Sequence, residues 1–214
     1  MDQPMEESGM RIEFCAPMGI GKTTMAAALA KYYNYELVEE ASINHPFLPD
    51  FYKDPQKYGF EKDAYFALAY NFNVKKLAGQ NTIFDAGHLG NQAYNALTPK
   101  KPEEKAVMDA LYAQAETLPP PDLIIYLDYA PEKIIERIIG RGREMEKDEK
   151  DMLKDYIPQL QQAMVERLPS ANAPVLRLNM EDFDLINRPD DVLKIARLVS
   201  ERLKKPAPAK RPTP

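Results

Sequence analysis

One short stretch near the start of the chain carries the strongest signal: Ala16-Pro17-Met18-Gly19-Ile20-Gly21-Lys22-Thr23-Thr24. Its spacing is that of a phosphate-binding loop, or Walker A motif, with alanine at the position of the first glycine. An apolar run over residues 10–16 precedes it, and a helix-favouring run over 24–31 follows it. This is the strand–loop–helix context that the motif requires, so the stretch predicts a site for nucleotide phosphates.

The residue types in this loop match what phosphate binding requires. Gly19 and Gly21 carry no side chain, so backbone N–H groups can approach phosphate oxygens, and the following helix adds the positive end of its dipole. We expect Lys22 to reach the outer phosphates of ATP and Thr23 to offer its hydroxyl to Mg²⁺. The alternative is a glycine-containing turn that binds nothing and is followed by Lys22 and Thr23 by coincidence.

Short apolar runs alternate with helical segments along the rest of the chain. Strands are predicted over residues 10–16, 35–39, 81–85, 122–128 and 174–179. Helices are predicted over 24–31, 60–77, 102–116, 132–139, 148–167 and 190–203, with Pro158 expected to kink or divide the fifth of them. Strands that alternate with helices predict an α/β fold, in which a mostly parallel sheet is covered by helices on both faces.

Length, composition and charge restrict the class of protein. The chain has 214 residues, one cysteine, and 28 Lys and Arg against 33 Asp and Glu, which gives a net charge of −5. This charge argues against a nonspecific nucleic-acid coat, and the single cysteine excludes a disulfide scaffold. No apolar run approaches the roughly 18 residues of a membrane-spanning helix. We therefore expect a cytoplasmic protein with no nucleic-acid or membrane partner.

The segment organisation is simple. We predict a flexible N-terminus over residues 1–9, a folded unit over 10–203 and a disordered tail over 204–214. The tail reads Lys-Lys-Pro-Ala-Pro-Ala-Lys-Arg-Pro-Thr-Pro, so it is rich in proline and basic residues. These basic residues could contact a polyanion, and the alternative is a solvated tail without a partner.

Three arginines follow the fourth predicted strand: Arg137, Arg141 and Arg143. On a helix, Arg137 and Arg141 share one face. Near a phosphate loop, three guanidinium groups would neutralise the charge that develops on a transferring phosphoryl group. The alternative is the solvated end of a surface helix. Because the phosphate loop is present in the same chain, we predict an arginine-rich lid.

Two carboxylates end predicted strands at the edge where a ligand crevice is expected. Glu40 follows the second strand and could accept the proton of an attacking hydroxyl, with Glu39 as the next candidate. Asp85 ends the third strand and could hold Mg²⁺ directly or through water. For each of them, a solvated or capping role is the alternative. An aromatic cluster could line a pocket for a flat base or pack in the core: Phe47, Phe51, Tyr52, Tyr58, Phe60, Tyr65 and Phe66.

Together these residues resemble the deoxyribonucleoside kinase family, of the deoxyadenosine and deoxyguanosine kinase type. The likeness extends from Ile12 to about Val199. It rests on the phosphate loop, Glu40, the strand that ends at Asp85 and the arginine lid. It also rests on four further segments, at 45–55 (His-Pro-Phe-Leu-Pro-Asp-Phe-Tyr-Lys-Asp-Pro), 58–60 (Tyr-Gly-Phe), 121–127 and 174–183.

The resemblance implies a three-layer P-loop NTPase fold with a five-stranded parallel sheet. It implies MgATP-dependent phosphorylation of a nucleoside 5′-hydroxyl in nucleotide salvage, with ATP and Mg²⁺ as cofactors. Glu40 would be the general base, Tyr52 and Glu146 would hold the sugar 3′-hydroxyl, and Arg137, Arg141 and Arg143 would form the lid. The partners would be a small nucleoside and, as often in the family, a second copy of the chain in a homodimer.

Two positions depart from the family pattern. The family usually has an acidic residue, arginine and serine at the end of the third strand, whereas here Asp85 is followed by Ala86 and Gly87. The arginine that usually lies beside the 5′-hydroxyl is therefore missing, and His88 or a lid arginine is a candidate source of its charge. The family also usually has a base-pairing glutamine at the position of Asp63, which makes Asp63 a candidate substrate residue.

Three functions fit these residues. A nucleoside kinase with an altered acceptor pocket explains the loop, the lid and Glu40 together. A kinase of nucleoside monophosphates, or of another small phosphate acceptor, is the second, because the missing arginine leaves room for a different acceptor. A non-catalytic nucleotide-binding or assembly subunit is the third, and Lys22, Thr23 and the lid argue against it. The chain lacks the Asn-Lys-x-Asp motif that would indicate a GTPase.

Overall fold

Five parallel strands form the centre of the molecule, in the order β2-β3-β1-β4-β5. The structure is a computed structural model that describes residues 9–42, 44–140 and 150–204. The strands are β1 (Arg11–Cys15), β2 (Glu36–Val38), β3 (Thr82–Phe84), β4 (Leu123–Asp128) and β5 (Val175–Asn179). Each lies within one of the five predicted ranges, and all pairs are parallel, so the predicted sheet is confirmed.

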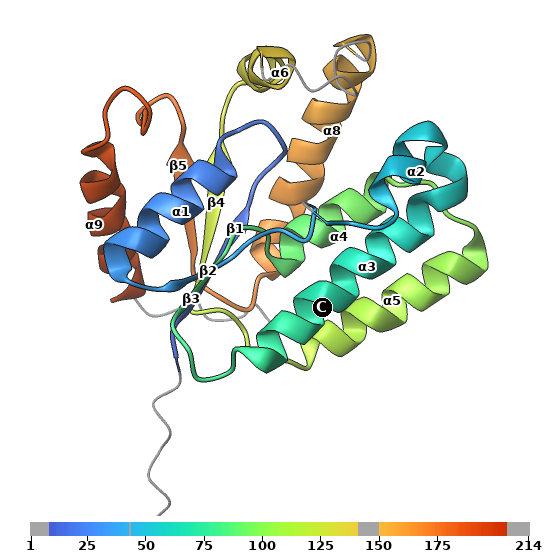
Figure 1. Cartoon of the computed structure of the whole chain (residues 1–214), viewed down its shortest axis with the longest axis horizontal. Helices are drawn as coiled ribbons and strands as arrows, with labels where there is room; N and C mark the ends of the chain where they lie inside the picture. Colours follow the sequence, from blue (N-terminus) through green and yellow to red (C-terminus); the bar gives the residue numbers. More distant parts are fainter. Residues whose placement is uncertain (1–8, 43, 141–149, 205–214) are drawn as a thin grey trace, which may run out of the picture.

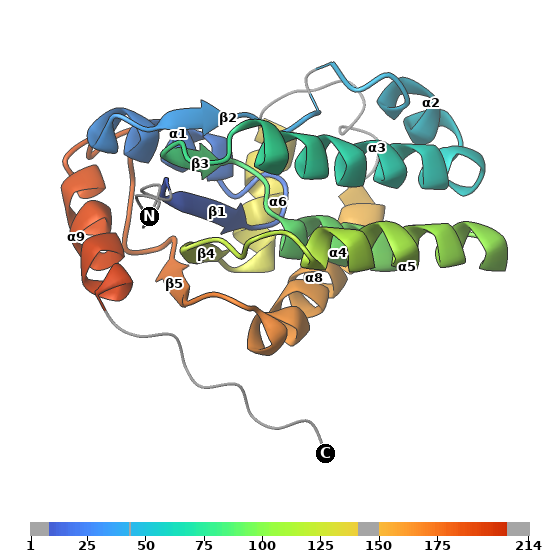
Figure 2. The same ribbon diagram turned by 90° about the horizontal axis from the view of Figure 1, so that it is seen from below.

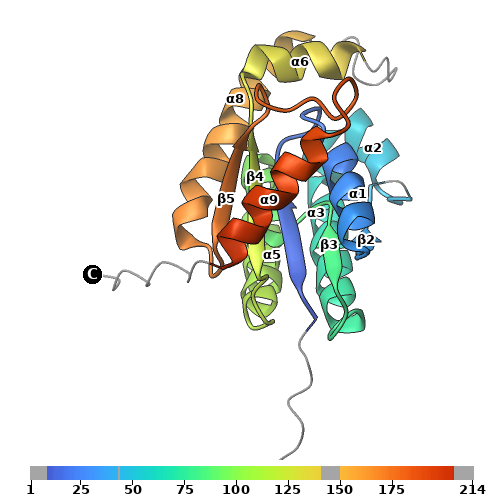
Figure 3. The ribbon, with the colours of Figure 1, turned by 90° about the vertical axis from the view of Figure 1, so that its left-hand side faces the viewer.

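Helices cover both faces of this sheet, which confirms the three-layer architecture (Figure 1). In Figure 3, α1 (Lys22–Tyr33) and α9 (Asp191–Leu203) cross in front of the strands on one face. The opposite face carries α3 (Pro55–Lys76), α4 (His88–Leu97), α5 (Pro102–Glu116) and α8 (Lys150–Arg167) (Figure 2). The remaining elements are α2 (Leu48–Lys53), α6 (Pro131–Gly140) and the 3₁₀ turn Leu168–Ser170.

The central strands alternate between two hydrophobic cores, because successive side chains of a strand point to opposite faces. Ile12 and Phe14 of β1 pack with the residues of α1 and α9 in one core. Cys15 and Tyr126 pack with α4 and α8 in the other. Glu13 lies on this second face, although it is charged, and its environment is described below. Burial on both faces explains why β4 reads as a nearly continuous apolar run and why β1 is apolar apart from Arg11 and Glu13.

The structure differs from the helical predictions at four helices: α2, α3, α4 and α8. Neither α2 nor α4 was predicted, and α3 begins at Pro55 rather than at residue 60. Asp54 caps α3 by accepting a hydrogen bond of 3.1 Å from the backbone N–H of Lys57, and Pro55 occupies the first turn, where its missing N–H costs nothing. α8 runs without a break through Pro158, so of the two predicted effects of this proline the division is wrong, and the kink stays a prediction. Buried residues on both sides of the proline hold the two halves of the helix against the sheet.

Because the strands are parallel, their carboxyl ends meet at one edge of the sheet. The phosphate loop follows β1, Glu40 follows β2 by two residues, and Asp85 directly follows β3. The topology thus brings the predicted phosphate site and both carboxylates together. Among the described residues, no helix is long and apolar enough to cross a membrane. The predicted flexible start and disordered tail fall largely on residues 1–8 and 205–214, which lie outside the described part of the chain.

Candidate active site

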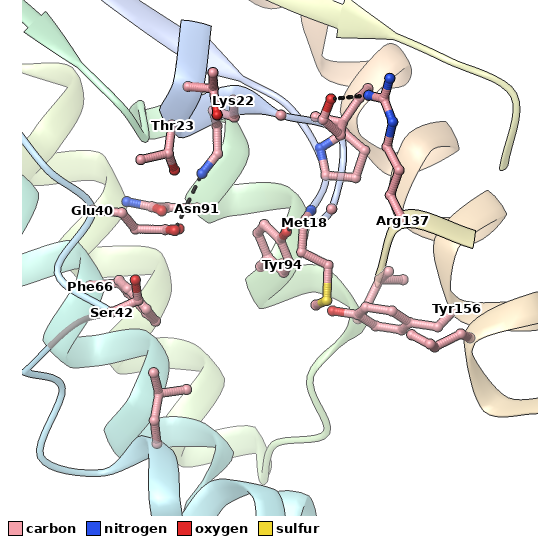
Figure 4. A pocket seen from close by; sticks show the side chains of 18 of the residues that line it. Met18, Lys22, Thr23, Glu40, Ser42, Phe66, Asn91, Tyr94, Arg137 and Tyr156 are labelled. Atoms are coloured by element: carbon pink, nitrogen blue, oxygen red, sulfur yellow. Dashed lines mark hydrogen bonds and ion pairs between the residues drawn. The ribbon is translucent and has the colours of Figure 1, made fainter. Parts of the chain in front are cut away.

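A cavity of about 780 Å³ lies along the carboxyl edge of the sheet. One part of its wall is the phosphate loop, residues 17–24, together with Arg137. Another part comes from Glu40 and from side chains of α2, α3 and α4 (Figure 4). We call the first part the donor half and the second the acceptor half. Glu39, the second candidate base, is exposed and forms no part of the described wall, whereas Glu40 lines the cavity.

The phosphate loop has the backbone conformation that phosphate binding requires. Gly19 and Gly21 have φ values of 84° and 103°, in the left-handed region that favours glycine. No side chain caps the N-terminus of α1, and its first turn carries no acidic residue. The N–H groups of this helix start are therefore left for an anionic ligand, which the helix dipole also attracts.

Lys22 lies between two carboxylates from different strands. Its Nζ is 3.3 Å from Glu40 Oε2 and 3.6 Å from Asp85 Oδ1 (Figure 4 shows the first pair). Burial would lower the pKa of Lys22, but the neighbouring Glu40 and Asp85 carboxylates raise it above its ordinary value. The ammonium group therefore stays charged in a site that water hardly reaches. Two predicted functional residues, Lys22 and Glu40, are thus brought into direct contact.

Thr23 and Asp85, the two predicted Mg²⁺ ligands, also meet. The Thr23 hydroxyl donates a hydrogen bond of 2.7 Å to Asp85 Oδ2. Asp85 is 2% exposed, and its Oδ1, which faces Lys22 Nζ at 3.6 Å, has no hydrogen-bond partner in the described part of the chain. A hydroxyl beside a carboxylate that keeps an unsatisfied oxygen fits the oxygen donors that Mg²⁺ prefers. These residues therefore fit the ion, whose remaining ligands would be substrate phosphates and water.

Arg137 is the lid arginine that the structure describes. Its guanidinium donates a hydrogen bond of 2.8 Å to the backbone carbonyl of Ile20, within the phosphate loop, and lies 4.5 Å from the centroid of the Tyr129 ring. This arrangement holds a cation against the phosphate loop, while the arginine-rich lid itself stays a prediction. Arg141, Arg143 and Glu146 lie outside the described residues, so their predicted roles stay predictions.

The acceptor half has a floor of three buried charges. Asp63 lines the cavity and is 2% exposed; its Oδ1 is 2.7 Å from Lys62 Nζ and its Oδ2 is 2.6 Å from Lys100 Nζ. Lys100 also donates to the carbonyls of Asn95 and Thr98, at 3.1 and 3.3 Å. Burial lowers the pKa of Lys62, although Asp63 opposes this shift. Asp63 was predicted from the sequence as a candidate substrate residue, whereas Lys62 and Lys100 were not.

The aromatic cluster divides between the cavity and the core. Phe51, Tyr52 and Phe66 line the cavity, and Lys62 Nζ lies 4.4 Å from the Phe51 ring centroid. Phe60, by contrast, packs between α3 and α5. Tyr65 stacks against the buried ring of His45, with centroids 4.4 Å apart. Both interpretations of the cluster therefore hold, each for different residues.

The structure argues against His88 as the replacement for the missing arginine. His88 is not part of the described cavity wall; its ring packs between Tyr70 and Tyr112, with centroids 5.5 and 5.4 Å away. Burial lowers the pKa of His88, and its Nε2 has no hydrogen-bond partner among the described residues. A neutral ring on the sheet side of α4 cannot supply positive charge to the cavity.

The turn before α4 is shaped by Glu13 of β1. Glu13 Oε2 accepts a hydrogen bond of 3.3 Å from the backbone N–H of His88, and its Oε1 accepts one of 2.8 Å from the Tyr70 hydroxyl. Burial raises the pKa of Glu13, and Arg11, Tyr70 and the His88 N–H oppose this shift. A Cβ atom at Gly87 would lie 2.6 Å from Glu13 Oε2. Glycine is therefore needed at position 87 because Glu13 occupies the space that a side chain would take, and not because the backbone angles require it.

Three residues that α4 contributes to the cavity were not predicted from the sequence: Asn91, Tyr94 and Leu97. The Tyr94 hydroxyl accepts a hydrogen bond of 2.8 Å from the backbone N–H of Met18 in the phosphate loop. The spacing of Leu89, Ala93 and Leu97, four residues apart, was a signal for this amphipathic helix.

The chain was compared with known proteins. A family model described as "Deoxynucleoside kinase" matches residues 16–204. Deoxyadenosine kinase of Dictyostelium discoideum is 34% identical over 189 residues, which cover 82% of this chain and 74% of that protein. Deoxyadenosine/deoxycytidine kinase of Bacillus subtilis (strain 168) is 29% identical over 196 residues, or 86% of this chain and 88% of that protein. A solved structure of deoxyadenosine kinase from M. mycoides with bound dCTP superposes with a TM-score of 0.70. It covers 89% of this chain and 100% of that one at 24% identity, which supports the fold.

Proposed function

The chain belongs to the deoxynucleoside kinase family and is a phosphotransferase that acts on a nucleoside hydroxyl; we propose that its acceptor is the 5′-hydroxyl of deoxyadenosine and its donor MgATP. A salvage nucleoside kinase is favoured over a monophosphate kinase and over a non-catalytic subunit, because the curated relatives are nucleoside kinases. The choice of deoxyadenosine rests on the 34% identical relative, which is named for that substrate.

The observation that carries the proposal is the position of Lys22 between Glu40 and Asp85. In the proposed reaction Lys22 turns from Glu40 to the outer phosphates when ATP binds, which frees the Glu40 carboxylate. Glu40 is 26% exposed, so an acceptor hydroxyl can approach it. Glu40 would then act as the general base that takes the hydroxyl proton.

The donor half would hold the triphosphate. Residues 16–24 would hold the phosphates through backbone N–H groups and Lys22, and Arg137, with Arg141 and Arg143, would cover them as a lid. Thr23 and Asp85 would hold Mg²⁺, which supplies charge neutralisation between the phosphates when it is bound.

The acceptor half would hold the nucleoside. We propose that Phe51 and Phe66 flank the base, because both line the cavity and present apolar rings. Asp63 is an acceptor and can bond the amino group of adenine, while the adjacent Lys62 can donate to a ring nitrogen. Tyr52 and Glu146 would hold the sugar 3′-hydroxyl.

The proposal is tested with the purified chain, radiolabelled ATP and a panel of acceptors: the four deoxynucleosides and dAMP. We expect deoxyadenosine to have the highest kcat/KM. Glu40→Gln should lower turnover by about 10²-fold and leave the Kd for ATP unchanged, as expected of a general base. Glu39→Gln is the matched control, because Glu39 is exposed and outside the described cavity wall.

Each alternative gives a distinct result in the same assay. Transfer to dAMP without transfer to deoxyadenosine would establish a monophosphate kinase. ATP binding without transfer to any acceptor would favour the non-catalytic subunit. We also propose that the chain forms a homodimer, as the family resemblance implies, and sedimentation velocity of the full chain tests this directly.

A further inference from the structure

Among the described residues, neither residue 86 nor His88 supplies a cation to the cavity, although phosphoryl transfer places negative charge there. Residue 86 is alanine, and the His88 ring lies outside the described cavity wall. Negative charge that develops on a transferring phosphoryl group is stabilised by hydrogen-bond donors already in position. A further hydrogen-bond donor, placed where the donor half of the cavity wall meets the acceptor half, would have to act together with Lys22 and Arg137.

Tyr94 occupies this boundary. It projects from α4 into the cavity between the Lys22–Glu40 pair and Met18 (Figure 4). Its hydroxyl oxygen accepts the hydrogen bond of 2.8 Å from the Met18 N–H, which fixes the oxygen beside the phosphate loop. The hydroxyl is thus held at the loop by a bond that uses its acceptor capacity and leaves its proton available.

The proton of this hydroxyl has no acceptor within the described part of the chain. A tyrosine hydroxyl has one proton to donate, and the bond from Met18 does not use it. Burial raises the pKa of Tyr94 well above its ordinary value, and the nearby Tyr156 and Glu40 raise it further. Tyr94 therefore remains a neutral donor across the physiological pH range.

We propose that Tyr94 is a further catalytic residue, which donates its hydroxyl proton in a hydrogen bond to an oxygen of the transferring phosphoryl group. This inference rests on the proposed function. In the transfer, a bond forms between the acceptor 5′-oxygen and the γ-phosphorus. The bond from that phosphorus to the β,γ-bridging oxygen breaks, and its electron pair stays on ADP. The hydroxyl proton of the acceptor goes to Glu40, and Tyr94 keeps its own proton throughout.

Tyr94→Phe tests the proposal, because it removes the hydroxyl and keeps the ring. We expect kcat to fall by about 10²-fold, as for the loss of one preorganised donor. The KM for the nucleoside and the Kd for ATP should change by less than about tenfold, since only one neutral hydrogen bond within the loop is lost. Tyr112→Phe is the control: Tyr112 also bonds to α4, at 3.1 Å from the Asn91 carbonyl, but it is outside the described cavity wall.

Two results would overturn the proposal. If the Kd for ATP weakens by as much as kcat falls, Tyr94 only shapes the phosphate loop. If kcat is unchanged, or falls equally in Tyr112→Phe, Tyr94 has no role of its own. The unmodified chain separates these results from a failure of the proposed function. If it transfers phosphate to a different acceptor, only the deoxyadenosine assignment fails, and Tyr94→Phe is measured on that acceptor. If it transfers to none, both proposals fail.

Discussion

The two halves of the cavity use buried charges in opposite ways. In the donor half, the Lys22 ammonium group faces Asp85 and, across the cavity, Glu40, and Asp85 Oδ1 has no hydrogen-bond partner among the described residues. In the acceptor half, two ammonium groups close on the single carboxylate of Asp63, and Lys100 has further carbonyl partners. Hydrogen-bonding capacity therefore remains unused beside the phosphate loop, whereas most of that capacity around Asp63 is used within the protein.

This difference separates a charge that can change partners from charges that keep their protein partners while a ligand binds beside them. Groups with unused hydrogen-bonding capacity can exchange partners when a ligand arrives, as we propose for Lys22. Groups whose capacity is used within the protein instead fix the shape of a wall, and their removal leaves buried charges without partners. Substitutions in the donor half should therefore change activity most, and those in the acceptor floor should change stability most.

The largest expected effect is on activity, at Lys22. Lys22→Ala should lower turnover by about 10³-fold, because a preorganised charge next to the phosphates is lost. Steady-state transfer from ATP measures it. Lys31→Ala is the matched control, since Lys31 is an exposed lysine in the last turn of the same helix. A Lys22→Ala chain that keeps more than about a tenth of the turnover would contradict the assignment of Lys22 to the phosphates.

The next effect is on stability, at Asp63. Asp63→Ala leaves Lys62 and Lys100 buried without their shared carboxylate, so the free energy of unfolding should fall by about 3–5 kcal/mol. Urea denaturation measures this change. Asp50→Ala is the control: Asp50 pairs with Lys53 at 3.2 Å but is half exposed, and its loss should cost less than about 1 kcal/mol. Equal losses in the two variants would show that the floor is not a stabilising cluster.

The donor half and the sheet could be predicted from the sequence because their signals are local. The phosphate loop occupies consecutive residues, and each strand is a continuous apolar run between helices. The roles of Gly19, Gly21, Lys22 and Thr23 could be predicted without knowing which distant residues lie beside them. Glu40 and Asp85 followed from one topological rule, that the ends of parallel strands meet at one edge.

The acceptor floor could not be predicted in the same way, because its contacts are long-range. Lys100 reaches Asp63 across 37 positions, and Tyr94 reaches Met18 across 76. No spacing rule connects such pairs. Asp63 was predicted only because it departs from a family pattern. Nothing in the sequence indicated that Lys62 and Lys100 would pair with it and so allow its burial. The same holds for Glu13, whose charge in a central strand has no local explanation.

Gly87 lies between Asp85, just after β3, and the start of α4, and it gives the smallest and most specific test. Its φ of −98° is open to any residue, so a substitution there meets only its neighbours. A Cβ atom would lie 2.6 Å from Glu13 Oε2 and 2.8 Å from Glu13 Cβ. Gly87→Ala should therefore lower the free energy of unfolding by about 1–3 kcal/mol, as overpacking does.

A double-mutant cycle with Glu13→Ala shows whether this cost comes from Glu13. Glu13→Ala removes the nearer of the two contacts but keeps the Cβ atom, so we expect the pair of substitutions to cost about 1 kcal/mol less than the sum of the single ones. Urea denaturation of the four chains gives the coupling. Strict additivity would mean that the contacts that remain in Glu13→Ala, 2.8 Å to the Cβ of residue 13 and 3.2 Å to the carbonyl oxygen of Phe14, set the limit instead. A positive coupling would show that the carboxylate of residue 13 is what makes a side chain at residue 87 costly.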